Sequence, residues 1–136
     1  MELTACRNLR GRITQLEARL KLWREASPAR SRLEACRQST PTESTPERLT
    51  RLICDGEREL ANLRGALEET AAALAAEIFT RVTDPRAAGV LFLRYVACLP
   101  FDEIARQAGY SIGHVFKLHR AGCKNFWAGA QAQTAS

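Results

Sequence analysis

The sequence has no two cysteines at C-x-x-C spacing and no other close pair of cysteines, so it offers no zinc site. Gly-rich phosphate loops, paired catalytic carboxylates and nucleophile–base motifs are also absent. The two histidines, His114 and His119, stand apart from any such partner. We therefore expect no metal, no cofactor and no enzymatic activity. The five cysteines are scattered, which is typical of small buried residues in a reduced, cytoplasmic protein.

Long apolar runs are missing as well. The longest one, AAGVLFLRYVACLPF, is interrupted by Arg94 and is too short to cross a bilayer. Residues 1–12 are polar and charged, so they do not resemble a signal peptide. We predict a cytoplasmic protein with no membrane partner.

Alternation of apolar and polar residues with period two is absent over any useful length, and helical spacing takes its place along nearly the whole chain. We predict an all-α fold. Two seams of apolar or small residues follow the spacings of three and four that are typical of packed helices. The first seam comprises Cys6, Leu9, Ile13, Leu16, Leu20 and Trp23. The second comprises Leu49, Ile53, Gly56, Leu60, Leu63, Leu67, Thr70, Leu74 and Ile78.

Both seams belong to a predicted module of residues 1–80. The Ser-, Thr- and Pro-rich segment RQSTPTESTPE, residues 37–47, is predicted as a flexible linker, and its end starts a helix over residues 46–80. The seams can be buried against each other in a helical hairpin. They can equally be buried against a second copy of the chain in a coiled-coil homodimer. The sequence leaves both arrangements open.

Charge is distributed unevenly between the two parts of the chain. The net charge is +5 and the isoelectric point is about 9.3. Residues 1–80 carry 13 Lys and Arg against 12 Asp and Glu, whereas residues 81–136 carry 7 against 3. The excess positive charge therefore lies in the C-terminal part and favours a polyanionic partner for it.

Residues 81–128 are predicted to form a tri-helical helix-turn-helix module, and residues 129–136 a disordered tail. In the stretch FDEIARQAGYSIGHVFKLHRA, Ala105 stands where two helices touch and Gly109 where the turn needs a positive φ. Ser111 is expected to cap the second helix. The apolar anchors expected to hold the helices together are Ile104, Ala108, Tyr110, Val115 and Leu118.

The second helix of this unit, residues 111–121, is the candidate DNA-reading element. Lys117 and Arg120 can reach base acceptors or phosphates from a helix in the major groove. Phe116 is a large apolar residue at an outward position, where it can touch a thymine methyl group or fold back onto the preceding helix. The predicted DNA-binding residues are Ser111, Ile112, Gly113, His114, Phe116, Lys117, Arg120 and Lys124.

The segment RAAGVLFLRYVACLPFDEIARQAGYSIGHVFKLHRAGCKNF resembles the fourth region of bacterial sigma factors. More closely, its RY, IA and YSIGHVFKLH elements are similar to the ArpU/RinA-type late transcription regulators of phages and prophages, which also tend to carry an N-terminal helical hairpin. Sigma factors usually have Arg and Glu where this chain has Ile112 and Gly113, so their promoter contacts do not carry over. No counterpart of the second sigma region is present.

The resemblance implies a sequence-specific regulator of phage or prophage transcription that binds double-stranded DNA. One alternative is an adaptor that binds RNA polymerase or another protein through the hairpin or the helix-turn-helix face. Another is a small-terminase-like DNA-packaging protein, although that architecture usually places the DNA-binding part first.

Overall fold

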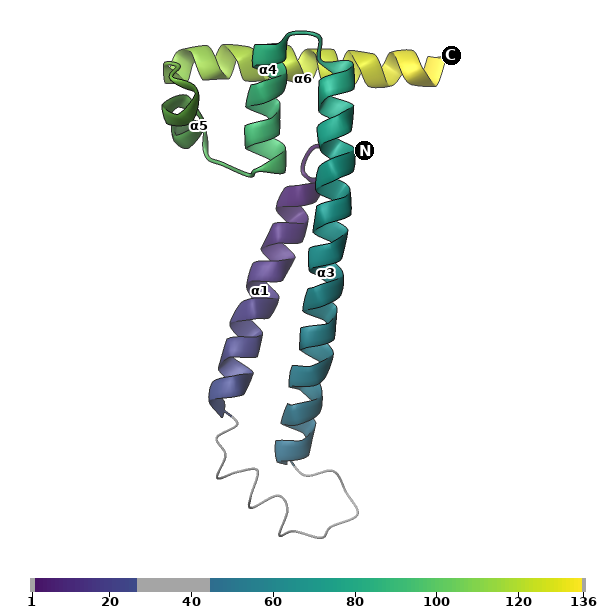
Figure 1. The fold of residues 1–136 in the computed structure, drawn as a ribbon, viewed down its shortest axis with the longest axis vertical. Coiled ribbons are helices and arrows are strands. Elements are labelled where there is room, and N and C mark those ends of the chain that lie inside the picture. The colour runs from purple at the N-terminus through teal and green to yellow at the C-terminus, as the bar shows by residue number, and fades with distance from the viewer. Residues whose placement is uncertain (1, 27–44, 136) are drawn as a thin grey trace. The chain divides into compact units, whose positions relative to one another are not determined.

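The computed structural model describes residues 2–26 and 45–135, and within these ranges it contains helices and turns but no strand (Figure 1). This confirms the all-α fold class. None of the helices in these ranges combines the length and the apolar character that a membrane span requires. Residues 37–44 of the predicted linker lie outside the described residues, and residues 45–47 already belong to a helix. The elements are α1 (Ala5–Ala26), α3 (Thr45–Arg81), α4 (Pro85–Leu91), the π-helix η1 (Phe92–Val96), α5 (Phe101–Ala108) and α6 (Ile112–Ala135).

The chain divides into two compact units, which we call the α1–α3 unit (Leu9–Ala66) and the α4–α6 unit (Met1–Asn8 with Leu67–Ser136). The sequence predicted a boundary after residue 80, whereas the two units divide the chain between residues 66 and 67. Apolar side chains decide the division, because the last turns of α3 contribute buried residues such as Leu74 and Ile78 to the same core as α4 and α6.

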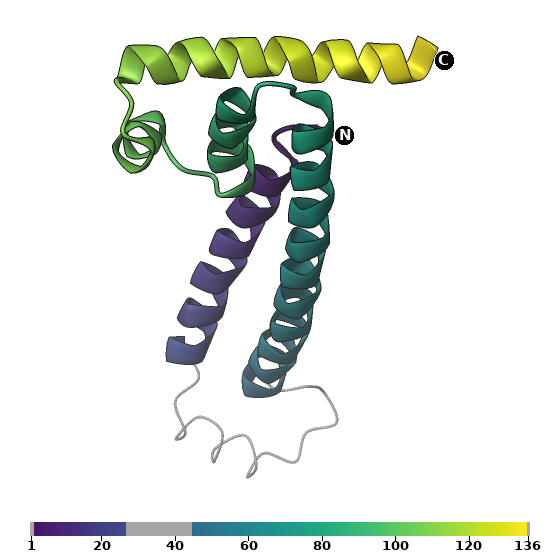
Figure 2. The same cartoon turned by 45° about the horizontal axis from the view of Figure 1, so that its top comes forward.

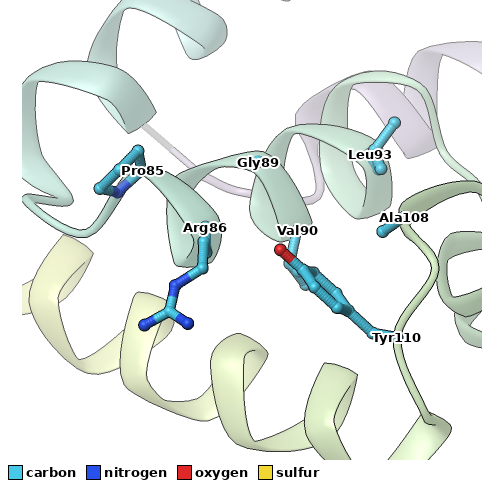
Figure 3. A pocket seen from close by; sticks show the side chains of 7 residues that line it. All are labelled: Pro85, Arg86, Gly89, Val90, Leu93, Ala108 and Tyr110. Atoms are coloured by element: carbon cyan, nitrogen blue, oxygen red, sulfur yellow. The ribbon is translucent and has the colours of Figure 1, made fainter.

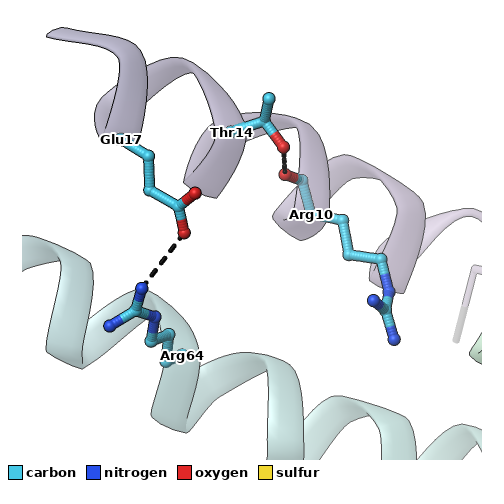
Figure 4. Close-up of polar contacts among 4 residues, drawn as sticks. All are labelled: Arg10, Thr14, Glu17 and Arg64. Carbon is cyan, nitrogen blue, oxygen red and sulfur yellow. Dashed lines mark hydrogen bonds and ion pairs between the residues drawn. The ribbon is translucent and has the colours of Figure 1, made fainter. Parts of the chain in front are cut away.

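In the α1–α3 unit the middle parts of the two predicted seams are buried where the helices lie side by side (Figures 1 and 2), and the outer parts are half-buried. Glu17 pairs with Arg64 at 3.1 Å (Figure 4), and Arg24 pairs with Glu57 at 2.8 Å. The residue numbers rise along α1 while they fall along α3, so the two segments run antiparallel. These ion pairs are about half exposed, so each contributes little stability, and the buried seams contribute most of it. The buried seam residues are Ile13, Leu16, Leu20, Gly56, Leu60 and Leu63.

Two neighbouring leucines of α1 test how the seam stabilises this unit. Leu20 is 1% exposed and Leu22 is 64% exposed. We expect Leu20→Ala to lower the free energy of unfolding by about 2–5 kcal/mol, because it removes buried methyl groups and leaves a cavity. Leu22→Ala should change it by less than about 0.5 kcal/mol. Denaturant unfolding of the two variants measures the difference, and equal losses would contradict the seam.

The α4–α6 unit begins with a strongly capped helix. Asp84 is the N-cap of α4 and its carboxylate accepts a hydrogen bond from the Arg86 backbone N–H at 3.0 Å. Pro85 follows at the first helical position, where its missing N–H costs nothing. The helix then buries one face in the core. The fully buried larger side chains of this core are Leu74, Ile78, Val90, Leu91, Ile104, Val115 and Phe126.

The helix that begins at Pro85 changes from an α-helix to a π-helix before it ends. The sequence predicted one α-helix to about Cys98, but the turns widen into the π-helix η1, where the Ala97 N–H bonds the Phe92 carbonyl at 3.0 Å. Cys98 has a φ of 59°, which is unusual for a residue other than glycine. This left-handed residue lets the Leu99 N–H reach back to the Leu93 carbonyl at 2.9 Å, which is one residue further back than in a Schellman C-cap and fits the wider π-helical turn.

Helix α6 lies across α4 in both views (Figures 1 and 2), and it continues to Ala135. Residues 129–135, which were predicted as a disordered tail, are helical in this structure, and alanine and glutamine are good helix formers. Gly122 is a point of close approach to α4. A Cβ added there would lie 3.0 Å from Leu91 Cγ and 3.3 Å from the Ala87 carbonyl oxygen.

Gly122 and Gly113 on the same helix form a matched pair for stability. Gly122→Leu should lower the free energy of unfolding by about 1–3 kcal/mol, because the side chain cannot fit against Leu91 and Ala87. Gly113 is exposed and a Cβ there meets nothing within 4 Å. Gly113→Leu should therefore stabilise the helix by up to about 1 kcal/mol. Thermal unfolding of both variants checks this, and two equal shifts would show that α6 does not approach α4 at Gly122.

Candidate functional site

The connection between α5 and α6 is built by local signals that the sequence predicted. Gly109 ends α5 with a φ of 73°, and the Tyr110 N–H bonds the Ala105 carbonyl at 3.0 Å. Ser111 then caps α6, because its Oγ accepts a hydrogen bond from the His114 backbone N–H at 3.2 Å. The predicted positive φ of Gly109 and the predicted cap of Ser111 are both confirmed.

Four of the five predicted anchors hold the two helices together. Ile104, Val115 and Leu118 are buried and Tyr110 is half-buried. The prediction for Ala108 is wrong, because it lies exposed in the last turn of α5.

A groove of about 270 Å³ lies beside Ala108 (Figure 3). It is mostly apolar, and it opens between α4 and the turn that leads into α6. Its lining residues are Pro85, Arg86, Gly89, Val90, Leu93, Ala108 and Tyr110.

The exposed face of α6 lies opposite its buried face. With 3.6 residues per turn, Gly113, Lys117, Arg120 and Lys124 follow one line along the helix. We call this line the cationic stripe. All four residues are exposed, whereas Val115, Gly122 and Phe126, on the opposite side of the helix, are buried. Packing against α4 and the core therefore leaves the stripe turned to solvent.

The three cations of the stripe differ from the other cations of residues 81–136. Arg81 pairs with Glu77 at 2.6 Å, Arg86 with Asp84 at 3.6 Å and Arg106 with Glu103 at 3.1 Å.

Arg94, the remaining cation outside the stripe, lies over the Phe101 ring at 4.3 Å and donates to the Leu99 carbonyl at 3.1 Å. Among the described residues, Lys117, Arg120 and Lys124 make no ion pair. Their charge is therefore available to an external anion.

The apolar and aromatic residues near the stripe are only partly covered. Phe116 remains 44% exposed, while its ring packs edge-on against Phe101 with the centroids 5.0 Å apart. It therefore folds back onto the preceding helix and still presents an edge to solvent. Ile112 is 48% exposed. His114 is half-buried against the Tyr110 ring at 4.9 Å, so it is the least accessible of the predicted site residues.

A polar cluster behind this face was missed by the sequence reasoning, which treated His119 as isolated. The Tyr95 hydroxyl lies 2.7 Å from His119 Nε2, and Cys123 Sγ lies 3.6 Å from the same nitrogen. Phe101 packs edge-on against the imidazole at 5.1 Å. The spacing of His119 and Cys123 by four residues was a visible signal, since it places them on one helix face. No sequence signal indicated that Tyr95 approaches His119, because Tyr95 lies in the π-helix η1.

Burial keeps every member of this cluster neutral. It lowers the pKa of His119, with a further contribution from the nearby Arg94 guanidinium. It raises the pKa of Tyr95 to about 12, with Cys123 adding to the effect, and it raises the pKa of the Cys123 thiol. A protonated thiol is a poor nucleophile, and in this structure the Cys123 thiol packs beside His119 Nε2 and the Tyr95 hydroxyl.

The other described cysteines only partly match the expectation of small buried residues. Cys6 is buried and Cys98 is half-buried, but Cys54 is exposed. Cys36 lies outside the described residues. No group of three or more potential metal ligands occurs in the described part of the chain.

Comparisons of the chain with protein-family models, with curated proteins and with solved structures found no match. The geometry of α6 and its surroundings is therefore the basis on which a function can be proposed.

The Tyr95–His119–Cys123 cluster predicts an acid-sensitive fold. The unfolded chain takes up a proton at His119 near pH 6.5, whereas the folded chain, in which the pKa of His119 is lowered, does so only at lower pH. Stability should therefore fall as the pH drops below about 6.5, because the unfolded state binds the proton first. His119→Gln should flatten this dependence, measured by denaturant unfolding at a series of pH values. His114→Gln is the control that keeps the cluster intact, and an unchanged pH profile in His119→Gln would contradict the assignment.

Proposed function

We propose that the protein is a sequence-specific DNA-binding transcription regulator of phage or prophage type that reads the major groove with residues 111–121. In this proposal α5, the turn at Gly109 and α6 form a helix-turn-helix unit. The observation that carries it is the cationic stripe, because Lys117, Arg120 and Lys124 are exposed and make no ion pair among the described residues.

Dimensions and chemistry both support a groove-reading helix. An α-helix with its side chains is about 10–12 Å wide, which matches the major groove of B-DNA at about 12 Å. Lys117 and Arg120 lie one turn apart on the face that packs against nothing in the α4–α6 unit. Arg120 can pair bidentately with guanine O6 and N7, and Lys117 can reach a base or a phosphate. Ser111 fixes the first turn of α6, which sets the direction from which the helix approaches DNA.

The N-terminal module of this proposal is a helical hairpin. The antiparallel ion pairs of Glu17 with Arg64 and of Arg24 with Glu57 support it over a coiled coil between two chains. A homodimer would then use surfaces outside the buried seams, and it would place two reading helices on the two half-sites of a target.

A second candidate function is an adaptor that binds RNA polymerase or another protein through α6. The exposed Ile112 and Phe116 favour it, because exposed apolar and aromatic side chains are typical anchors of protein interfaces. An adaptor of this kind would derive its binding energy from apolar contacts and not from the cations of the stripe.

Neutralising two cations of the stripe separates the two functions. Lys117→Ala with Arg120→Ala should weaken binding to promoter DNA adjacent to the protein's own gene by at least tenfold, without lowering the melting temperature. If both residues bind phosphates, the slope of log K against log salt should flatten by about 0.9 for each phosphate that the variant no longer neutralises. If one of them binds a base, its removal should instead cost about 1–3 kcal/mol at one position of the target. Affinity measured across a salt series checks both effects.

Arg86→Ala with Arg106→Ala is the matched control. It removes the same charge from exposed side chains of the same unit, but these two cations already pair with Asp84 and Glu103. The control should bind DNA nearly as the wild type does. If the Lys117 and Arg120 pair also binds DNA with unchanged affinity and slope, the DNA-reading function is wrong. The Ile112→Ser, Phe116→Ser variant then tests the adaptor function by its loss of polymerase binding.

A further inference from the structure

The exposed face of α6 continues beyond residues 111–121, the part that is proposed to lie in the major groove of DNA. Trp127 is 49% exposed and follows Arg120 by seven residues and Lys124 by three. These spacings place the indole beside the cationic stripe, on the same side of the helix. Trp127 lies ten residues after Lys117, which is about 15 Å along the helix axis.

The structure holds the backbone of Trp127 firmly while it leaves much of the indole uncovered. The neighbouring Phe126 is fully buried, and the Arg81 guanidinium lies 4.7 Å from its ring centroid. The Trp127 ring packs edge-on against Phe126, with the centroids 5.4 Å apart and the planes at 88°. A tryptophan anchored at one edge and exposed elsewhere has the geometry of a contact residue, since burying the indole against a partner costs little conformational entropy.

The charge around Trp127 selects an anionic partner. The sequence contains no Asp or Glu after Glu103, so α6 carries no acidic side chain. Lys124 and Arg120 lie within two turns of Trp127, are exposed and make no ion pair among the described residues. A partner that covers this end of the stripe must therefore bring negative charge and hydrogen-bond acceptors for the indole N–H.

We infer that Trp127 and Lys124 form a second contact with duplex DNA, which binds the sugar–phosphate backbone outside the groove read by residues 111–121. This inference rests on the proposed function. The major groove is about 12 Å wide, so a straight helix whose first turns lie in the groove has reached the phosphates about 15 Å further on. There the indole N–H donates to a phosphate oxygen and the Lys124 ammonium neutralises the same strand. Such a contact positions α6 without reading sequence.

Tryptophan fluorescence reports on this contact directly. The chain has two tryptophans, so Trp23→Phe leaves Trp127 as the sole indole. In that background, short mixed-sequence duplexes should change the emission of Trp127 as they bind, and the change should saturate together with binding measured by gel shift. A duplex that binds with no change in Trp127 emission would overturn the inference.

Substitutions separate the contribution of the Trp127 indole from that of the Lys124 ammonium. Trp127→Phe keeps an aromatic ring against Phe126 but removes the N–H, and it should weaken binding about tenfold on every duplex sequence, as expected when a hydrogen bond to a charged group is removed. The salt slope should stay unchanged, because the indole is neutral. Lys124→Ala should flatten the slope by about 0.9. Phe79→Ala, which changes another exposed aromatic residue (55% exposed), is the control and should leave binding unchanged.

The outcomes separate this inference from the proposed function. If the Lys117 and Arg120 variant loses affinity while the Trp127→Phe and Trp127→Ala variants bind as the wild type does, the backbone contact is wrong and the groove-reading function stands. If Trp127→Phe keeps its affinity for duplexes but Trp127→Ala loses affinity for matching single strands, Trp127 stacks on bases, and the duplex contact is wrong. A wild-type protein that binds no duplex at low salt overturns both proposals.

Discussion

The close approach of Gly122 to Leu91 determines how α6 is rotated about its own axis. A side chain at this position would meet Leu91 and the Ala87 carbonyl, so α6 lies directly on α4 because Gly122 has none. This contact, together with buried Val115 and Phe126, assigns one face of α6 to the core. The opposite face, with Lys117, Arg120 and Lys124, is then exposed by geometry. Stability and the proposed binding are therefore carried by different faces of one helix, and this is why substitutions can address them separately.

A second constraint comes from the irregular end of the helix that begins at Pro85. The π-helix η1 turns Tyr95 toward His119, and Cys98 then adopts a left-handed conformation that glycine usually supplies. Both features cost local energy, and they persist because the surrounding contacts stabilise them. The Leu99 N–H satisfies the Leu93 carbonyl, and Arg94 satisfies the Leu99 carbonyl while it covers the Phe101 ring. The connection into α5 is therefore fixed before the proposed reading unit begins.

Sequence patterns predicted the parts of this structure that depend on nearby residues. The cap at Ser111, the positive φ of Gly109 and the buried seams follow from signals within a few positions of each residue. Two features that the sequence did not predict depend on distant residues. Tyr95 reaches His119 only because a π-turn intervenes, and the unit boundary moved to residue 67 because the end of α3 shares a core with α4 and α6. The helix after residue 128 was missed because its small polar composition was read as a tail, although alanine and glutamine favour helix.

The residues on the exposed face of α6 do not favour the stability of the isolated chain, which supports the proposed binding of a partner there. Lys117, Arg120 and Lys124 are like charges at spacings of three and four, which destabilise a helix by about 0.2–0.5 kcal/mol per pair. Gly113 costs about 1 kcal/mol relative to alanine in a place where a Cβ meets nothing. Phe116 and Trp127 leave large apolar surfaces in water on the same helix. A merely solvated face would alternate Glu with Lys and would carry alanine at position 113. Because these unfavourable choices lie together on the largely exposed side of α6, they are consistent with a surface that becomes favourable only when an anionic partner covers it.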